Sequence, residues 1–186
     1  MENNKFKSDP YNSRNRKIQV DEILNLMKSL NIEYQVSNLS LFQTAFVHKS
    51  YTNLQDYEEY TKPCDCLPLF KESYETMEFL GDSLLGSIVS TYLYKRYVGH
   101  FEIDEGFLTK LKIRLVCGER LGDFSKCLGF DQWIILSKHI DDNCEGRTNI
   151  HILEDVFEAF LGALYLDSDD LDLVKRFIIA TIERHV

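Results

Sequence analysis

Long apolar runs are absent from this sequence. No stretch of about 18 residues lacks charge, because acids or the adjacent Lys95 and Arg96 interrupt the apolar segments. The N-terminus is polar and does not resemble a secretory signal peptide. We therefore expect a soluble protein without membrane segments that resides inside the cell, in the cytoplasm.

Cysteine is scarce and odd in number. The five cysteines stand at positions 64, 66, 117, 127 and 144. Without a secretory signal, an odd count argues against a disulfide framework and predicts reduced thiols. The pair Cys64-x-Cys66 resembles half of a zinc site, but no second pair of ligands with the spacing of a structural zinc site follows. A loop is therefore the favoured interpretation.

Positive charge is in deficit, with 21 Lys and Arg against 30 Asp and Glu and a net charge of −9. Because nucleic-acid affinity comes largely from cations that neutralise phosphates, this balance argues at first sight against such a partner. Bound divalent ions would offset it, although affinity would stay modest and salt-dependent. Residues 1–17 are the exception, carrying five Lys and Arg against two acids. We expect them to form a flexible N-terminal arm; an ordinary disordered terminus is favoured over a phosphate-binding tail.

The alternation of apolar and polar residues that predicts strands is also missing. Helical spacing is present instead, as in Ile23, Leu26, Met27 and Leu30, which follow an i, i+3, i+4, i+7 pattern. With 186 residues and 44% hydrophobic content, the chain is long enough for one core. The sequence therefore predicts one all-α domain over residues 18–186.

Acids interrupt an apolar segment between Ser73 and Ser83. Glu75, Glu78 and Asp82 are spaced i, i+3, i+7, which places them on one helical face. The residues that follow are apolar nearly all round, so we expect a buried helix whose first carboxylates are partly desolvated. Such acids either take up protons or bind a metal ion, and hard oxygen ligands suit Mg²⁺ or Mn²⁺.

A second apolar segment, Ile150 to Asp167, also carries acids on one side. Asp155 and Glu158 are spaced i, i+3 within it. The small residues of the two segments would let the two backbones approach closely: Gly81, Gly86, Gly162 and Ala163. We therefore predict that Glu78, Asp82, Asp155 and Glu158 converge on one metal site.

These motifs resemble those of a known family. Glu-Phe-Leu-Gly-Asp-Ser at 78–83 is similar to the signature of the ribonuclease III family, and residues 154–167 resemble its second catalytic block. Residues 41–50 are similar to its first helical block, and Asp104-Glu105-Gly106 followed by Leu115-Val116 resembles its connecting block. The four matches stand in the family's order, and the resemblance covers roughly residues 18 to 184.

The resemblance implies an all-helical endonuclease domain that forms a two-fold homodimer. It assigns four acids to the catalytic, metal-binding set: Glu78, Asp82, Asp155 and Glu158. Glu158 would be the most sensitive to substitution. Glu75 and Glu105 would line the substrate valley, and Phe79 would plug into the partner subunit across the dimer axis. The implied cofactor is Mg²⁺, with Mn²⁺ as a substitute.

The implied activity is cleavage of double-stranded RNA to products with 5′-phosphate and 3′-hydroxyl ends. Each subunit would cut one strand and leave short 3′ overhangs, with little sequence preference because such duplexes are read by shape. One alternative is a catalytically silent member kept as an RNA-binding or structural protein, but such proteins typically lose one of the four acids. A helical di-iron protein needs Glu-x-x-His motifs, and this sequence has none.

Three departures from the family pattern qualify this interpretation. Tyr74 stands where asparagine is common and Thr76 where arginine is common, so polar contacts near the substrate or dimer interface should differ. A longer connection, residues 51–73, reads as an inserted, ordered surface excursion that could alter substrate access. Many members continue into a double-stranded RNA binding domain, which we do not expect within this chain. A minimal member and a part of a longer protein both remain open.

Overall fold

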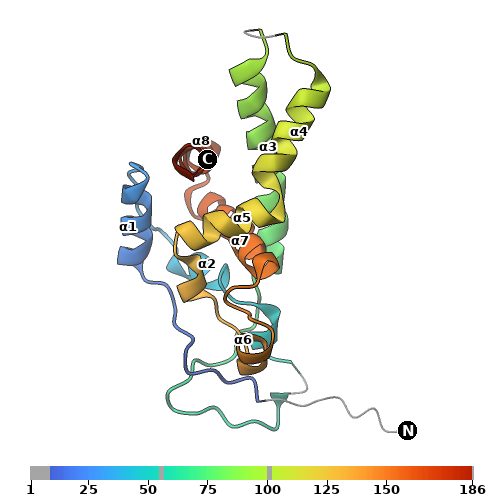
Figure 1. Cartoon of the computed structure of the whole chain (residues 1–186). Coiled ribbons are helices and arrows are strands. Elements are labelled where there is room, and N and C mark those ends of the chain that lie inside the picture. The colour runs from blue at the N-terminus through green and yellow to red at the C-terminus, as the bar shows by residue number, and fades with distance from the viewer. Residues whose placement is uncertain (1–8, 55–56, 100–101, 186) are drawn as a thin grey trace, which may run out of the picture.

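Helices provide the regular structure of the chain in the computed structural model, which describes residues 9–54, 57–99 and 102–185 (Figure 1). They are α1 (Val20–Ser29), α2 (Leu39–Thr44), α3 (Glu75–Tyr97), α4 (Glu105–Val116), α5 (Gly118–Cys127), α6 (Lys138–Asn143), α7 (Ile150–Ser168) and α8 (Leu171–His185), with 3₁₀ turns η1 (Lys49–Tyr51) and η3 (Phe130–Trp133). Within the described ranges, β pairing is limited to isolated bridges. The all-α prediction is confirmed.

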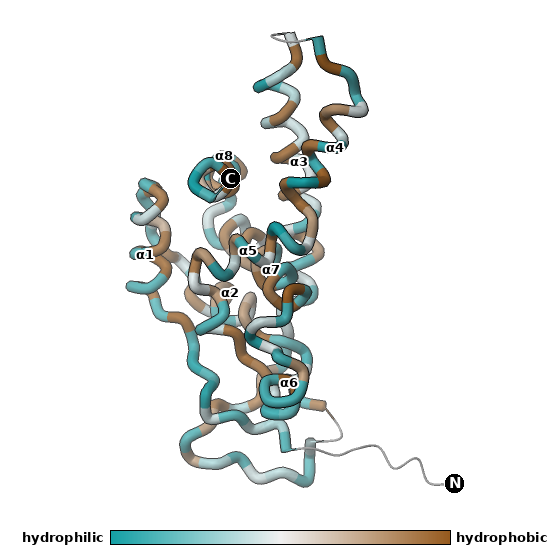
Figure 2. The backbone as a smooth tube through the Cα atoms, viewed as in Figure 1, coloured by the Kyte–Doolittle hydropathy of each residue, from teal (hydrophilic) through white to brown (hydrophobic). Residues whose placement is uncertain are grey.

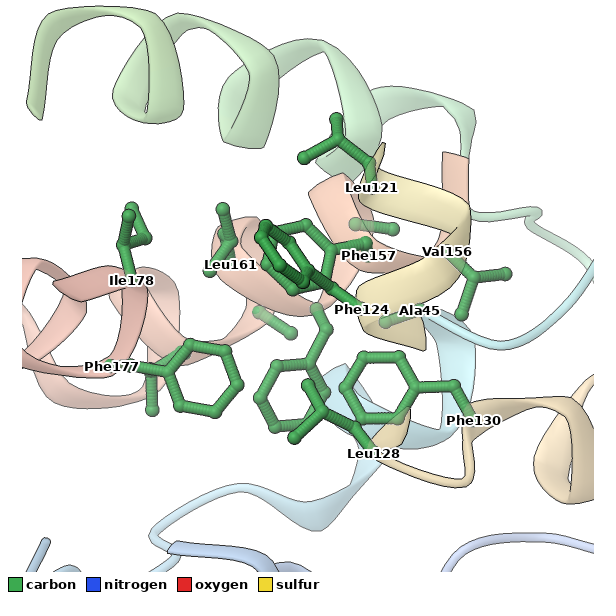
Figure 3. Close-up of a cluster of buried hydrophobic side chains, with 14 of the residues drawn as sticks. Ala45, Leu121, Phe124, Leu128, Phe130, Val156, Phe157, Leu161, Phe177 and Ile178 are labelled. Atoms are coloured by element: carbon green, nitrogen blue, oxygen red, sulfur yellow. The ribbon is translucent and has the colours of Figure 1, made fainter. Parts of the chain in front are cut away.

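Helix α7 lies at the centre of the fold. It is apolar on nearly every side, and α2, α3, α5 and α8 pack against it. Figure 3 shows the cluster around Phe157, to which α5 contributes Phe124 and α8 contributes Phe177. Ring centroids lie 4.9 Å apart between Phe130 and Phe160, within the range of favourable aromatic pairs. This packing makes α7 a rigid support for its acids.

The ends of α7 are set by two polar residues. The Asn149 side chain accepts a hydrogen bond from the backbone N–H of His151 at 3.0 Å, which caps the first turn. Asp169 takes a left-handed conformation with φ of 50° and ends the helix.

Figure 2 shows that hydrophilic residues gather on α6 and on the loops at the base of the molecule. None of the described helices combines the length and apolarity needed to cross a membrane.

The N-terminal boundary of the folded region differs from the prediction. Asn12 and Asn15 are only 3% and 7% exposed, and each donates a side-chain hydrogen bond to the Leu136 carbonyl. Arg147 in turn donates to the Asn15 side chain at 3.0 Å. The expectation of a flexible arm is therefore wrong for residues 12–15, because buried amides tie them to the domain. Residues 1–8 of that predicted arm lie outside the described residues.

The connection over residues 51–73 is anchored at its base. The Tyr51 hydroxyl donates to the Leu67 carbonyl at 2.9 Å, and the Phe70 amide donates to the Tyr51 carbonyl at 3.1 Å. The ring of Tyr51 is fully buried against Val47 and Ile135. The described part of this segment is therefore tied to the domain as an ordered surface excursion.

Candidate metal centre

The two acidic helices touch at two glycines. A Cβ atom added to Gly81 of α3 would lie 1.8 Å from the Glu158 carbonyl oxygen of α7. One added to Gly162 of α7 would lie 2.3 Å from the Met77 carbonyl oxygen of α3. These reciprocal contacts show that the helices cross in opposite directions with their backbones touching. The predicted close approach is confirmed for Gly81 and Gly162.

Gly86 plays a different part. A Cβ atom there would meet only the Lys112 Nζ atom of α4, at 3.7 Å. The prediction that Gly86 helps α3 approach α7 is therefore wrong. It lies about 1.4 turns beyond Gly81 on the helix, and this rotates it away from α7.

The crossing sets the acids of both helices within electrostatic range. Burial, followed by repulsion from Asp82 and other nearby acids, raises the pKa of Glu158 to about 8. Burial, followed by repulsion from Asp155 and Glu75, raises the pKa of Glu78 to about 7. Only 9% of Glu158 is exposed. The four predicted acids therefore form one group of mutually repelling carboxyl groups around the contact between α3 and α7.

This group fits a hard divalent cation by its chemistry. The donors are carboxylate oxygens, which suit Mg²⁺ and Mn²⁺. Within the described ranges no ion pair joins Glu78, Asp82 or Glu158 to a cation, so no positive side chain pairs with these carboxyl groups. In the same ranges no three acidic, histidine or cysteine side chains already converge on a point. Binding an ion therefore requires the carboxylates to rotate toward one another.

Asp155 has a partner that the sequence analysis did not assign. The Tyr74 hydroxyl donates a hydrogen bond to its Oδ2 atom at 2.8 Å. Burial, followed by the charge of Asp155, raises the pKa of Tyr74, so the hydroxyl stays protonated and able to donate. Burial raises the pKa of Asp155, and this hydrogen bond opposes the shift. Tyr74 thus contacts the acid group itself.

Comparison with known proteins identifies the family. The family model described as Ribonuclease-III-like matches residues 38–184. The chain belongs to the ribonuclease III-like family. Ribonuclease 3 of Geobacillus thermodenitrificans is 37% identical over 182 residues, covering 98% of this chain and 65% of the relative. Ribonuclease 3 of Enterococcus faecalis is 40% identical over 141 residues, covering 76% of this chain and 54% of the relative.

Solved structures of the ribonuclease III family agree. The nuclease domain of ribonuclease III from Campylobacter jejuni superposes with a TM-score of 0.69 at 25% identity, covering 89% of this chain and 97% of that one. A second structure of the same nuclease domain gives a TM-score of 0.68 at 26% identity. The chain spans less than two thirds of the length of the curated relatives it matches.

Glu75 lies at the edge of the group formed by the four acids. It is the first residue of α3, and its carboxylate pairs with the Lys49 Nζ atom at 3.4 Å. The Ser73 hydroxyl also donates to it, at 3.0 Å. The side chain is exposed and lines a hollow of about 600 Å³ together with Lys71. This place is compatible with the predicted contact to substrate.

Glu105 lies apart from the four acids. Glu105 begins α4, beside Phe107, whose ring packs edge-on against Tyr97 with centroids 5.9 Å apart. Tyr97 ends α3, 19 residues after Glu78, which corresponds to about 28 Å of helix. Figure 1 shows α3 and α4 as a hairpin that extends beyond the other helices. Within one chain of this ribonuclease III-like fold, Glu105 does not reach the acid group.

Phe79 follows Glu78 directly but points outward. Its side chain is the most exposed large hydrophobic residue described, at 76%. An aromatic ring so placed is costly in water unless a partner covers it. The exposure agrees with the role that the ribonuclease III resemblance implies for this residue.

Glu154 is a fifth acid that sequence reasoning left without a role. Its charge raises the pKa of both Glu78 and Glu158. Its carboxylate lies against the start of α5, where a Cβ added to Gly118 would be 2.3 Å from Oε2. The signal was available, because Glu154 precedes Glu158 by four residues and so shares its helical face.

Proposed function

We propose that this chain is a metal-dependent endoribonuclease domain that cleaves double-stranded RNA. The observation that carries the proposal is the group of carboxyl groups, with pKa values raised by burial and mutual repulsion, held on two helices whose backbones touch at Gly81 and Gly162. Membership of the ribonuclease III-like family supports it. A catalytically silent role is disfavoured because all four acids are present and lie within electrostatic range of one another.

The four acids would hold the metal ion, and the ion would contact the scissile phosphate. Glu78 and Asp82 of α3 and Asp155 and Glu158 of α7 would hold Mg²⁺, with Mn²⁺ as a substitute. When bound, the ion supplies a water of lowered pKa and stabilises charge on the phosphate oxygens. The rigid crossing of α3 and α7 limits how far the ligands can drift. The expected products carry 5′-phosphate and 3′-hydroxyl ends.

The proposed active form is a homodimer. The exposed Phe79 ring supports this, because burial against a second copy would remove it from water. A structure of the Campylobacter relative describes flexibility in a region involved in dimer formation of that nuclease domain. In such a dimer Glu105 would line the substrate surface beside the partner's acids. Two centres, one for each strand of the duplex, would leave short 3′ overhangs.

The dimer is tested by Phe79→Ser. We expect the variant to dissociate with a Kd raised about 30-fold or more, because loss of a central aromatic anchor typically costs 2 kcal/mol or more. Sedimentation equilibrium measures this, and circular dichroism should be unchanged because the ring is exposed. Leu54→Ser is the matched control, since Leu54 is an exposed apolar residue of the surface excursion. Equal dimer affinity in both variants would place the interface elsewhere.

The activity is tested with a long, perfectly paired RNA at low salt and with Mg²⁺. We expect the duplex RNA to be cut, and single-stranded RNA and double-stranded DNA to remain intact, because recognition depends on A-form shape and 2′-hydroxyls. A chelator should stop the reaction, and rising salt should weaken it. End analysis should find 5′-phosphates. If none of the substrates is cut although dimer formation and metal binding are verified, the catalytically silent, RNA-binding role is favoured over the enzymatic one.

A further inference from the structure

Tyr74 contacts both of the helices that carry the acids. It stands immediately before α3, and its backbone carbonyl accepts from the Glu78 amide at 2.9 Å. Its hydroxyl donates to Asp155 of α7 at 2.8 Å. Tyr74 therefore links the backbone of Glu78, one candidate metal ligand, to the side chain of Asp155, another candidate ligand.

The position of Tyr74 is itself fixed from other sides. Its amide donates to the Val47 carbonyl at 2.9 Å. Its ring packs edge-on against His48, with centroids 5.8 Å apart, and only 2% of the residue is exposed. A hydroxyl on so constrained a ring has little freedom to move away from Asp155.

The carboxylate of Asp155 depends on that hydroxyl for its orientation. The terminal torsion of aspartate is broad, so an unsupported carboxylate rotates easily. In residues 9–54, 57–99 and 102–185 no other side chain donates a hydrogen bond to it. The contact occupies Oδ2 and leaves Oδ1 available for an ion.

We propose that Tyr74 is a positioning residue for the metal centre, because its hydroxyl fixes the Asp155 carboxylate in the orientation that binds the ion. This rests on the proposed function. Tyr74 stands where the family commonly has asparagine, whose side chain is far shorter than a tyrosine ring and hydroxyl. Outer partners of metal ligands typically contribute 10- to 100-fold in affinity or activity.

A purely structural role makes a different prediction. A buried tyrosine hydroxyl needs a partner wherever it lies, and losing that hydrogen bond lowers stability without touching a metal site. Tyr51 offers the comparison within the same chain. Its fully buried ring also donates through its hydroxyl, at 2.9 Å, but to the Leu67 carbonyl in the surface excursion.

The experiment compares Tyr74→Phe and Tyr51→Phe in the full chain. Mn²⁺ binding is measured without RNA, by electron paramagnetic resonance of the free ion. We expect about tenfold weaker Mn²⁺ binding in Tyr74→Phe and wild-type binding in Tyr51→Phe. Calorimetric melting without divalent ions should show similar small losses in both. In an Asp155→Asn background, Tyr74→Phe should weaken binding no further, because the group it orients has been altered.

The outcomes separate this inference from the proposed function. If the unaltered chain fails to bind Mn²⁺, the metal centre and the role of Tyr74 are both overturned. If it binds Mn²⁺ and Tyr74→Phe binds equally well, only the positioning role is overturned. Equal weakening in Tyr74→Phe and Tyr51→Phe would also overturn it, since general loosening of the fold would explain both. Weakening confined to Tyr74→Phe supports the inference.

Discussion

Replacing Gly81 with alanine is expected to destabilise the domain by about 3 kcal/mol or more. The added methyl carbon would lie 1.8 Å from the Glu158 carbonyl oxygen, and backbone cannot turn aside as a flexible side chain can. To restore ordinary contact, α3 and α7 would have to separate by roughly 2 Å. Such a shift disturbs the packing of α7 and separates the acids. Thermal melting should fall by about 6 °C or more.

Gly86→Ala is the matched control for this effect. Gly86 is on the same helix, but its added methyl carbon would meet only the Lys112 Nζ atom, at 3.7 Å. Because alanine favours helix over glycine by up to about 1 kcal/mol, this variant should be unchanged or more stable. Opposite signs in the two variants identify the contact with α7 as the cause. If Gly81→Ala melted at the wild-type temperature, the close crossing of α3 and α7 would be refuted.

The sequence could predict the helices and the faces that carry the acids because both depend on local spacing. The i, i+3, i+7 pattern of Glu75, Glu78 and Asp82 already places them on one side of a helix. The crossing followed from small residues in two apolar segments, and Gly81 and Gly162 make that contact. Gly81 and Gly86 are five residues apart and therefore cannot share one helical face, but the sequence alone did not tell which of them meets α7.

Contacts between distant residues account for what the sequence could not predict. Tyr74 and Asp155 are 81 residues apart, and no local pattern links a tyrosine to a chosen carboxylate. Asn12 and Asn15 look like parts of a polar tail, yet their amides are buried by hydrogen bonds to Leu136, more than 120 residues away. Local composition describes how a segment would behave alone, whereas these residues are ordered by the rest of the fold.

Glu158→Gln is expected to remove cleavage while making the ion-free protein more stable near pH 8. The substitution keeps the size of the side chain but removes its charge and a hard ligand. Loss of several kcal/mol of stabilisation by the metal ion corresponds to a rate decrease of about a thousandfold. Cleavage of duplex RNA at saturating Mg²⁺ measures this first effect, with circular dichroism as the control for folding.

The gain in stability follows from the raised pKa of Glu158. Burial and the neighbouring Asp82, Glu154, Glu78 and Asp155 raise this pKa to about 8, from the ordinary value of 4.5. Between these pH values the folded state holds the proton and the unfolded state does not, so the stability of the wild type falls as pH rises. Glutamine does not titrate. In a chelator, the variant should therefore melt several degrees above the wild type near pH 8 and close to it near pH 4.

Adding Mg²⁺ tests whether Glu158 binds the metal ion or is only a buried charge that destabilises the fold. A ligand that binds only the folded state stabilises it according to its concentration relative to Kd. Mg²⁺ should therefore raise the melting temperature of the wild type near pH 8, and should raise that of Glu158→Gln much less. If the variant instead melted below the wild type in the chelator, the Glu158 carboxylate would be holding the fold together. Repulsion among the acids in the absence of a metal ion would then not be the main effect of the Glu158 carboxylate on the stability of the crossing between α3 and α7.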